Sequence, residues 1–339
     1  MMKLHYAGQS GKGFGWGVAN HYLKQEIARL VNLTEDPSEA DVVVMPLLNH
    51  DLDPVSNARG RINLAYTFFE SQLGTSAKKN ADTYNVVFAG SSWCVARLAE
   101  RNIHNAFPLI QGVDKSIFKW APPRPRDGHF RIFTGGKFEW RKGQDLVIAA
   151  FRELIKTHPT AHLVCAWHNP WPSLFSTMAN SPYIDTAANG STQAQFFANL
   201  LLVNGIPFDR FTILPQMSHE KMAEEMAATD CGLFPNRCEG GTNLVAMEYA
   251  SIGRPIVANA LTGHADIRDA ITHKIFATED SMGWADQTID EIHAKLVIAA
   301  SVEPTPILTA PVWEWSTAAR KIVETAQSID LQTWRWHNL

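Results

Sequence analysis

Residues 235–248 read Pro-Asn-Arg-Cys-Glu-Gly-Gly-Thr-Asn-Leu-Val-Ala-Met-Glu, and they follow the apolar run Asp230–Phe234. The pattern predicts a strand, a turn that contains a glycine pair, and the start of a helix. In open α/β folds such a turn lies at the carboxyl edge of a parallel sheet, where ligands bind. Glycine lets backbone approach a ligand closely, and the free N–H groups of a helix start favour phosphate. The stretch therefore predicts an anion-binding turn.

Two carboxylates flank this predicted site. Glu239 is expected beside the anion, and Glu248 about two turns further along the helix. Carboxylates hydrogen-bond well to ribose and sugar hydroxyls but repel free phosphate, so the pattern favours a nucleotide-sugar over a bare nucleotide. The alternative interpretation is an ordinary capped core helix with polar residues at its start. The backbone positions predicted to contact the donor are Gly241, Thr242, Asn243 and Leu244.

A second loop carries three cations in six residues. It lies between the predicted strand Arg131–Thr134 and the predicted helix Gln144–Thr157, and its cations are Lys137, Arg141 and Lys142. Cations at the carboxyl end of a strand can bind a diphosphate, although a solvated basic loop has the same composition. Both loops leave parallel strands at one edge, so they can bind the same ligand.

The whole chain has the composition of an ordinary globular protein. It has 339 residues, a net charge of −4 and a pI of about 6.3, which makes nucleic acid an improbable partner. The longest apolar runs, such as Val42–Leu48, are too short to span a membrane, although peripheral membrane contact is compatible with the sequence. The chain enters a strand at once, so no signal peptide is expected and the predicted compartment is the cytoplasm. The four cysteines match no zinc-site spacing, and neither a metal nor a cofactor is predicted.

Alternating strand and helix patterns occur in both halves of the chain, which is typical of parallel α/β sheets. Residues 121–128 contain three prolines in four positions and predict a stiff linker. Residues 169–189, rich in proline, serine and asparagine, predict a loop near the ligand site. The predicted organisation is an N-terminal domain over 1–120, a linker over 121–129, a C-terminal domain over 130–312, and a C-terminal helical segment over 313–339.

The N-terminal half offers weaker candidates. Gly13 and Gly15 lie in a glycine-rich loop between the first strand and helix, where a tight structural turn is the alternative to a ligand contact. Glu70 follows a predicted strand end and is a candidate for positioning an acceptor hydroxyl. Asp51 and Asp53 resemble a metal-binding pair, but Asp-Leu-Asp-Pro is a common turn sequence, and a turn is predicted.

Several motifs together resemble the retaining glycosyltransferases of family 4. The resemblance is specific over residues 132–267 and weaker in the first half, at 66–70, 91–93 and 111–118. The motifs that carry it are Gly136-Lys137 followed by Lys142-Gly143, Glu239 with Glu248, and Gly253-Arg254-Pro255-Ile256-Val257. The resemblance implies the GT-B fold, an α/β architecture in which two Rossmann-like domains face a central cleft. It also implies that the first domain binds the acceptor, that the second binds a nucleotide-sugar, and that the C-terminal helix crosses back to the first domain.

Carried over by position, Lys137 replaces the family's arginine and Lys142 matches its lysine, the pair that neutralises the donor diphosphate. Glu248 matches the residue that binds the ribose hydroxyls. Eight residues separate Glu239 from Glu248 where the family has seven. The Gly240–Gly241 turn is expected to absorb the extra residue, which leaves Glu239 to approach the transferred sugar. Gly13 and Gly15 are expected to reach the donor across the cleft.

The predicted activity is metal-independent transfer of a sugar from a nucleotide-diphosphate sugar with retention at the anomeric carbon. Lys137, Lys142 and Glu239 are the predicted catalytic residues. The acceptor is undetermined and includes saccharides and lipid-linked saccharides. Two alternatives stay open: a UDP-sugar 2-epimerase of the same architecture, and a catalytically silent partner subunit that binds nucleotide-sugar.

Overall fold

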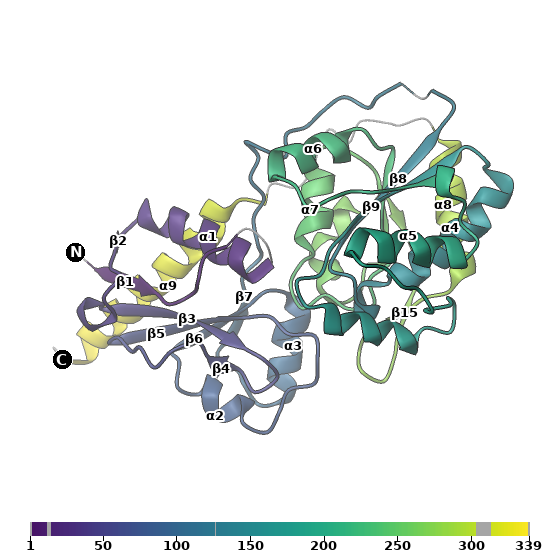
Figure 1. Cartoon of the computed structure of the whole chain (residues 1–339). Helices are drawn as coiled ribbons and strands as arrows, with labels where there is room; N and C mark the ends of the chain where they lie inside the picture. The colour runs from purple at the N-terminus through teal and green to yellow at the C-terminus, as the bar shows by residue number, and fades with distance from the viewer. Residues whose placement is uncertain (1, 12–14, 126, 303–312, 338–339) are drawn as a thin grey trace. The chain divides into compact units, whose positions relative to one another are not determined.

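The computed structural model describes residues 2–11, 15–125, 127–302 and 313–337 (Figure 1). The chain separates into two compact units, each built on its own mainly parallel sheet. The predicted α/β architecture of two Rossmann-like domains is confirmed. The first unit contains Met1–Val113, Gly240–Leu244 and Trp313–Leu339, and the second contains Asp114–Glu239 and Val245–Val312.

The first sheet has the strand order β2-β1-β3-β5-β6-β7 among the described residues, with β4 paired to β3. Only the β3–β4 pair is antiparallel within this sheet as described. Its strands are β1 (Lys3–Tyr6), β2 (Asn32–Leu33), β3 (Val42–Leu48), β4 (Asp53–Pro54), β5 (Ile62–Thr67), β6 (Val86–Ala89) and β7 (Ala106–Pro108). The helices of this unit are α1 (Gly15–Ala28), η1 (Pro37–Glu39), α2 (Ala77–Ala81), α3 (Ser92–Glu100) and α9 (Trp315–His337).

Helix α9, from the end of the chain, completes the core of the first unit. Its Ala319 and Ile322 are fully buried there, and Trp315 stacks on Tyr22 of α1 with 5.4 Å between ring centroids. In Figure 1 the yellow α9 runs beside the purple α1. Apolar residues at helical spacing near the C-terminus thus bury one face of α9 against the N-terminal sheet.

The second sheet is wholly parallel, with the order β10-β9-β8-β11-β12-β13 in the described residues. Its strands are β8 (Phe130–Gly136), β9 (Ala161–Trp167), β10 (Phe211–Ile213), β11 (Cys231–Phe234), β12 (Ile256–Ala258) and β13 (His273–Lys274), and a small antiparallel pair is formed by β14 (Thr278–Glu279) and β15 (Ala285–Asp286). The helices are η2 (Trp140–Lys142), α4 (Gln144–Thr157), η3 (Pro172–Asn180), α5 (Gln193–Val203), η4 (Phe208–Arg210), α6 (His219–Ala227), α7 (Leu244–Ser251), η5 (Thr262–Ala270) and α8 (Ile289–Ser301).

The direction of strand progression reverses between β8 and β11. The chain runs from β8 outward to β9 and β10, and then returns to place β11 against the other side of β8. Cys231 pairs with Ile132 and Gly232 with Phe133. A reversal of this kind opens a crevice at the carboxyl ends of the two strands, which is where open α/β sheets bind ligands. The two loops that carry the predicted cations and carboxylates leave these two strands.

Most predicted elements of the chain are present, with ends that differ by a few residues. The predicted helix Gln144–Thr157 is found with these bounds, and Ser218 caps α6 by accepting a hydrogen bond from Lys221 N at 3.3 Å. Asp51 lies in the predicted turn and accepts a hydrogen bond from Ser76 N at 3.0 Å. The loop predicted over 169–189 contains η3, and its anchors are described below.

Gly143, between η2 and α4, is expected to tolerate no side chain. Its φ is +73°, and an added Cβ would overlap the carbonyl oxygen of Pro235 at the end of β11. Gly143→Ala should therefore destabilise the chain by about 3 kcal/mol or more, measured by chemical denaturation. Gly205→Ala is the matched control, because Gly205 has a φ of +81° but its Cβ would meet only Arg152 Cδ at 3.9 Å. It should cost about 1–2 kcal/mol. Equal losses would show that Gly143 is needed for its φ alone.

Candidate functional site

The cation loop, residues 137–143, is anchored by a buried aromatic ring. Phe138 is fully buried and packs on Phe197 at 4.9 Å and Phe175 at 5.3 Å between ring centroids. Burying a phenylalanine side chain contributes about 2–3 kcal/mol, so this contact fixes the start of the loop. Lys137 and Glu139, on either side of Phe138, are thereby held at the end of β8.

The carboxylate loop, residues 235–239, is tied to the cation loop through backbone groups. The N–H groups of Arg237 and Cys238 both donate to Arg141 O, at 2.8 and 3.2 Å. The close approach of Gly143 to Pro235 described above belongs to the same contact. The prediction that both loops leave parallel strands at the same edge is confirmed, and the structure adds that the loops contact each other.

A buried ion pair fixes the base of both loops. Arg237 donates from both terminal nitrogens to the carboxylate of Asp145, at 2.7 Å each, and the Asp145 side chain is fully buried. The guanidinium also lies over the ring of Trp140, 4.6 Å from its centroid. Asp145 is in the first turn of α4, where a negative charge is favoured by the helix dipole. A bidentate pair of this kind gives fixed geometry as well as energy.

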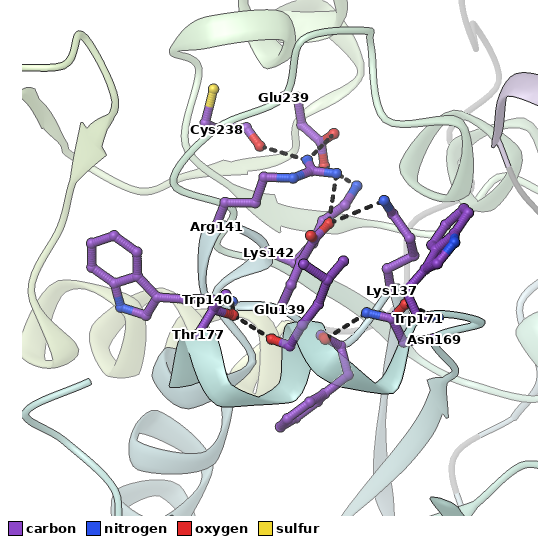
Figure 2. Close-up of polar contacts among 12 residues, drawn as sticks. Lys137, Glu139, Trp140, Arg141, Lys142, Asn169, Trp171, Thr177, Cys238 and Glu239 are labelled. Carbon is purple, nitrogen blue, oxygen red and sulfur yellow. Dashed lines mark hydrogen bonds and ion pairs between the residues drawn. The ribbon is translucent and has the colours of Figure 1, made fainter. Parts of the chain in front are cut away.

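The charged side chains of the two loops form one network (Figure 2). Lys142 Nζ lies 2.6 Å from Glu239 Oε1, and Arg141 Nη1 lies 3.4 Å from Glu239 Oε2. Arg141 Nη2 also pairs with Glu139 Oε1 at 2.6 Å, and Lys137 Nζ reaches the same oxygen at 3.5 Å. We call Lys137, Glu139, Arg141, Lys142 and Glu239 the charge cluster. Three cations and two carboxylates leave one net positive charge.

Glu239 is ionised in this cluster. Burial by itself raises the pKa of its carboxyl. The positive charges of Lys142 and Arg141 lower this pKa by more than burial raises it, and the result is a pKa of about 2. Asn236 Nδ2 donates to the same carboxylate, and Thr262 Oγ1 accepts a hydrogen bond from Glu239 N at 3.1 Å. The nearby His264 is fully buried, and burial lowers its pKa to about 4, so its imidazole is neutral at pH 7. The residue predicted to approach a sugar is thus a fixed, buried anion.

Glu248 has the opposite environment. It lies in the second turn of α7, is partly buried, and has a pKa raised to about 8 by burial. Within the described parts of the chain, no hydrogen bond or ion pair to its carboxyl group is found. A carboxyl group that is poorly solvated and lacks a protein donor is suited to accept hydrogen bonds from ligand hydroxyls.

The other predicted site residues are placed as follows. Gly13 lies outside the described residues, and Gly15 is the first residue of α1, where an added Cβ would meet no atom within 4 Å. Glu70 follows β5 in the first unit and is partly buried. In the segment Gly241–Leu244, Thr242 and Asn243 are buried and α7 begins at Leu244.

Between Glu239 and Glu248 the chain bends at Gly240 and Gly241 before α7 begins. Asn243, with a φ of 57°, is the residue in the left-handed region, whereas Gly240 and Gly241 have no such φ. Asparagine tolerates this conformation better than most residues. That the Gly240–Gly241 turn absorbs the extra residue stays a prediction.

Sequence reasoning missed several members of the site. Glu139 and Asn236 adjoin predicted residues, but nothing in their spacing indicated a shared partner. The Arg237–Asp145 pair joins residues 92 positions apart, which a single sequence cannot show. Arg141 was noted as a loop cation, and the structure adds that it pairs with both buried glutamates.

Comparison with known proteins places both loops inside one family match. Residues 129–293, which include both loops, match the family model described as glycosyl transferases group 1. No curated protein matches the chain by sequence.

Similar solved structures cover nearly the whole chain. Sucrose-phosphate synthase from Thermosynechococcus elongatus has 13% sequence identity and a TM-score of 0.63, covering 98% of this chain and 100% of that one. HepE of Anabaena, solved in complex with UDP and glucose, has 14% identity and a TM-score of 0.62, covering 97% and 100%. AviGT4, a glycosyltransferase involved in avilamycin A biosynthesis, has 15% identity and a TM-score of 0.60, covering 97% and 98%. At these identities the likeness shows the fold alone, and that fold is GT-B.

The described residues contain no helix that is long and apolar enough to cross a membrane. They also contain no group of three or more His, Cys, Asp or Glu side chains placed to hold a metal ion.

The raised pKa of Glu248 predicts a pH-dependent cost in stability. Because the folded-state pKa of about 8 exceeds the ordinary value of 4.5 for a glutamate, the neutral form contributes stability at low pH that is lost as pH rises through 8. Glu248→Gln keeps a neutral side chain at every pH. Its melting temperature should therefore exceed that of the wild type at pH 9 by a few degrees, equivalent to about 1 kcal/mol or more, with a smaller difference at pH 5.

Glu324→Gln provides the control, since Glu324 is an exposed residue of α9. It should show no difference between the two pH values. A Glu248→Gln effect that does not change with pH would mean that the carboxyl group is solvated in the folded state.

Proposed function

We propose that this protein is a retaining glycosyltransferase that transfers a sugar from a nucleotide-diphosphate sugar without a metal ion. The observation that carries the proposal is the charge cluster at the reversal point of the second sheet. There Lys142 and Glu239, from the loops that follow the neighbouring strands β8 and β11, lie 2.6 Å apart. The match of residues 129–293 to group 1 glycosyl transferases and the GT-B fold support it. The UDP complex of HepE makes UDP-sugars the first donors to test.

The costly step in this reaction is departure of the diphosphate. As the bond between the anomeric carbon and the phosphate oxygen breaks, negative charge develops on the leaving group. Preorganised cations aimed at this charge stabilise the transition state. Lys142 and Lys137 are the proposed donors of that stabilisation, and their positive charge takes the place of a metal ion.

Lys142 must change partners for this to happen. In the structure it pairs with Glu239, and a buried carboxylate that loses its only cation costs several kcal/mol. Glu239, however, also receives contacts from Arg141 and Asn236. These two contacts allow Lys142 to turn to the diphosphate while Glu239 stays compensated.

Glu239 is unsuited to move a proton. With a pKa of about 2 it is a weak base and is not protonated at neutral pH. We assign it two roles: holding Lys142 in position before the donor binds, and accepting a hydrogen bond from the transferred sugar. The acceptor's proton then passes to the departing diphosphate oxygen while the acceptor oxygen bonds to the anomeric carbon on the same face, which retains the configuration.

Glu248 and Glu70 complete the assignment. Glu248 accepts hydrogen bonds from the ribose hydroxyls, which would lower its raised pKa when the donor binds. Glu70, in the first unit, positions the acceptor hydroxyl.

The proposal is tested first by donor binding and turnover. A thermal-shift panel of UDP, GDP, ADP and their sugars should contain a stabilising ligand, with about 2.7 kcal/mol gained at a hundred times its dissociation constant. Incubation of that nucleotide-sugar with candidate saccharide acceptors should give a product with the donor's anomeric configuration by NMR. Conversion of the sugar without acceptor would indicate an epimerase, and a panel without any stabilising nucleotide would contradict the proposal.

Lys142→Ala should weaken nucleoside diphosphate binding about ten- to a hundredfold, because one charge-assisted hydrogen bond is worth about 1.5–3 kcal/mol. Isothermal titration calorimetry measures the change. The double variant Lys142→Ala with Glu239→Ala removes the uncompensated buried carboxylate and should bind equally weakly. Lys156→Ala, which alters an exposed lysine of α4, is the charge-matched control. Wild-type affinity in the Lys142 variants would remove this residue from the site.

A further inference from the structure

Trp171 is an exposed aromatic residue beside the charge cluster. It lies after β9, immediately before η3, and 46% of its surface is exposed. Its ring is 5.2 Å from Lys137 Nζ, measured to the ring centroid, which is within the range of a cation–π interaction. Figure 2 shows the Lys137 side chain next to this ring. The surrounding loop has no role in the function proposed above.

The backbone at Trp171 is fixed to the cation loop. Asn169 is fully buried, and its Nδ2 donates to Phe138 O at 2.9 Å while its Oδ1 accepts from Trp171 N at 2.9 Å. Gln193 braces Asn169 by accepting from its N–H at 3.1 Å and donating to its carbonyl at 2.9 Å. One buried amide therefore sets the distance between Trp171 and the residue that follows Lys137.

Lys137 needs such a support more than its neighbours do. Its side chain is 34% exposed, compared with 12% for Lys142 and 12% for Arg141. Its carboxylate partner is 3.5 Å away and is bound more closely by Arg141. A lysine is a point charge on a flexible stem, and fixing it costs about 2 kcal/mol of rotamer entropy. A weak ion pair at a partly exposed site offsets little of that cost.

We propose that Trp171 is a positioning residue for Lys137: the face of its indole ring holds the ammonium group at the donor diphosphate. This inference rests on the proposed function. It also explains how Lys137 can neutralise the donor diphosphate at a position where the family that this chain resembles has an arginine. An arginine fork is rigid by itself, whereas a lysine gains its placement here from an aromatic face that is fixed by Asn169.

The alternative is that Trp171 contributes only apolar surface. Two substitutions separate the cases. Trp171→Phe keeps an aromatic face and therefore a weaker cation–π interaction, while Trp171→Leu keeps apolar contact but removes the ring. An effect of the π face appears in the leucine variant and is largely rescued in the phenylalanine variant. An effect of apolar surface is about equal in both.

The experiment is a double-mutant cycle between Trp171→Leu and Lys137→Ala, read out by calorimetric dissociation constants. The probes are pyrophosphate and whichever of UDP, GDP and ADP stabilises the wild type most. We expect Trp171→Leu to weaken binding of both probes about threefold to tenfold, and Trp171→Phe to stay within about twofold of wild type. In the Lys137→Ala background, Trp171→Leu should have no further effect. Far-UV circular dichroism and melting temperatures confirm that each variant folds.

The outcomes separate this inference from the proposed function. Additive effects of Trp171→Leu and Lys137→Ala would overturn the positioning role while the donor site stands. Equal losses in the leucine and phenylalanine variants would do the same. If the wild type binds neither pyrophosphate nor any of the three nucleotides, the proposed function fails, and the inference fails with it.

Discussion

The buried ion pair between Lys142 and Glu239 is the contact on which the rest of the proposed site depends. It joins two loops that leave neighbouring parallel strands, so its geometry is inherited from the sheet rather than from flexible side chains. Three further contacts hold the two loops together: the close approach at Gly143, the hydrogen bonds to the Arg141 carbonyl, and the Arg237–Asp145 pair. Separating two buried charges costs free energy. The pair therefore fixes the position at which an incoming anion can compete with Glu239 for Lys142.

The two glutamates of the site are held in opposite electrostatic states. Glu239 is surrounded by cations and is a permanent anion, whereas Glu248 is poorly solvated and readily takes up a proton. Environments that shift the pKa values of two carboxyl groups in opposite directions are typical of functional sites. At such sites some stability is lost in favour of binding.

The sequence was informative where local pattern decides structure. Apolar periodicity and the glycines between elements predicted both sheets, and the strand ends predicted that the loops carrying Lys142 and Glu239 leave the same edge of one sheet. It was less informative where the outcome depends on distant partners. Asp145 meets Arg237 only after folding, and the support of Asn169 for Trp171 comes from a loop without periodicity. The left-handed conformation of Asn243, just before the start of α7, is a further feature that residue spacing alone does not encode.

The most direct test of the central claim is a crystal structure of the protein with a bound nucleoside diphosphate sugar. The account predicts that Lys142 Nζ leaves Glu239 and lies about 3 Å from a diphosphate oxygen, while Arg141 and Asn236 keep their contacts with Glu239. A diphosphate bound away from the reversal point between β8 and β11, with the Lys142–Glu239 pair still closed at 2.6 Å, would contradict it.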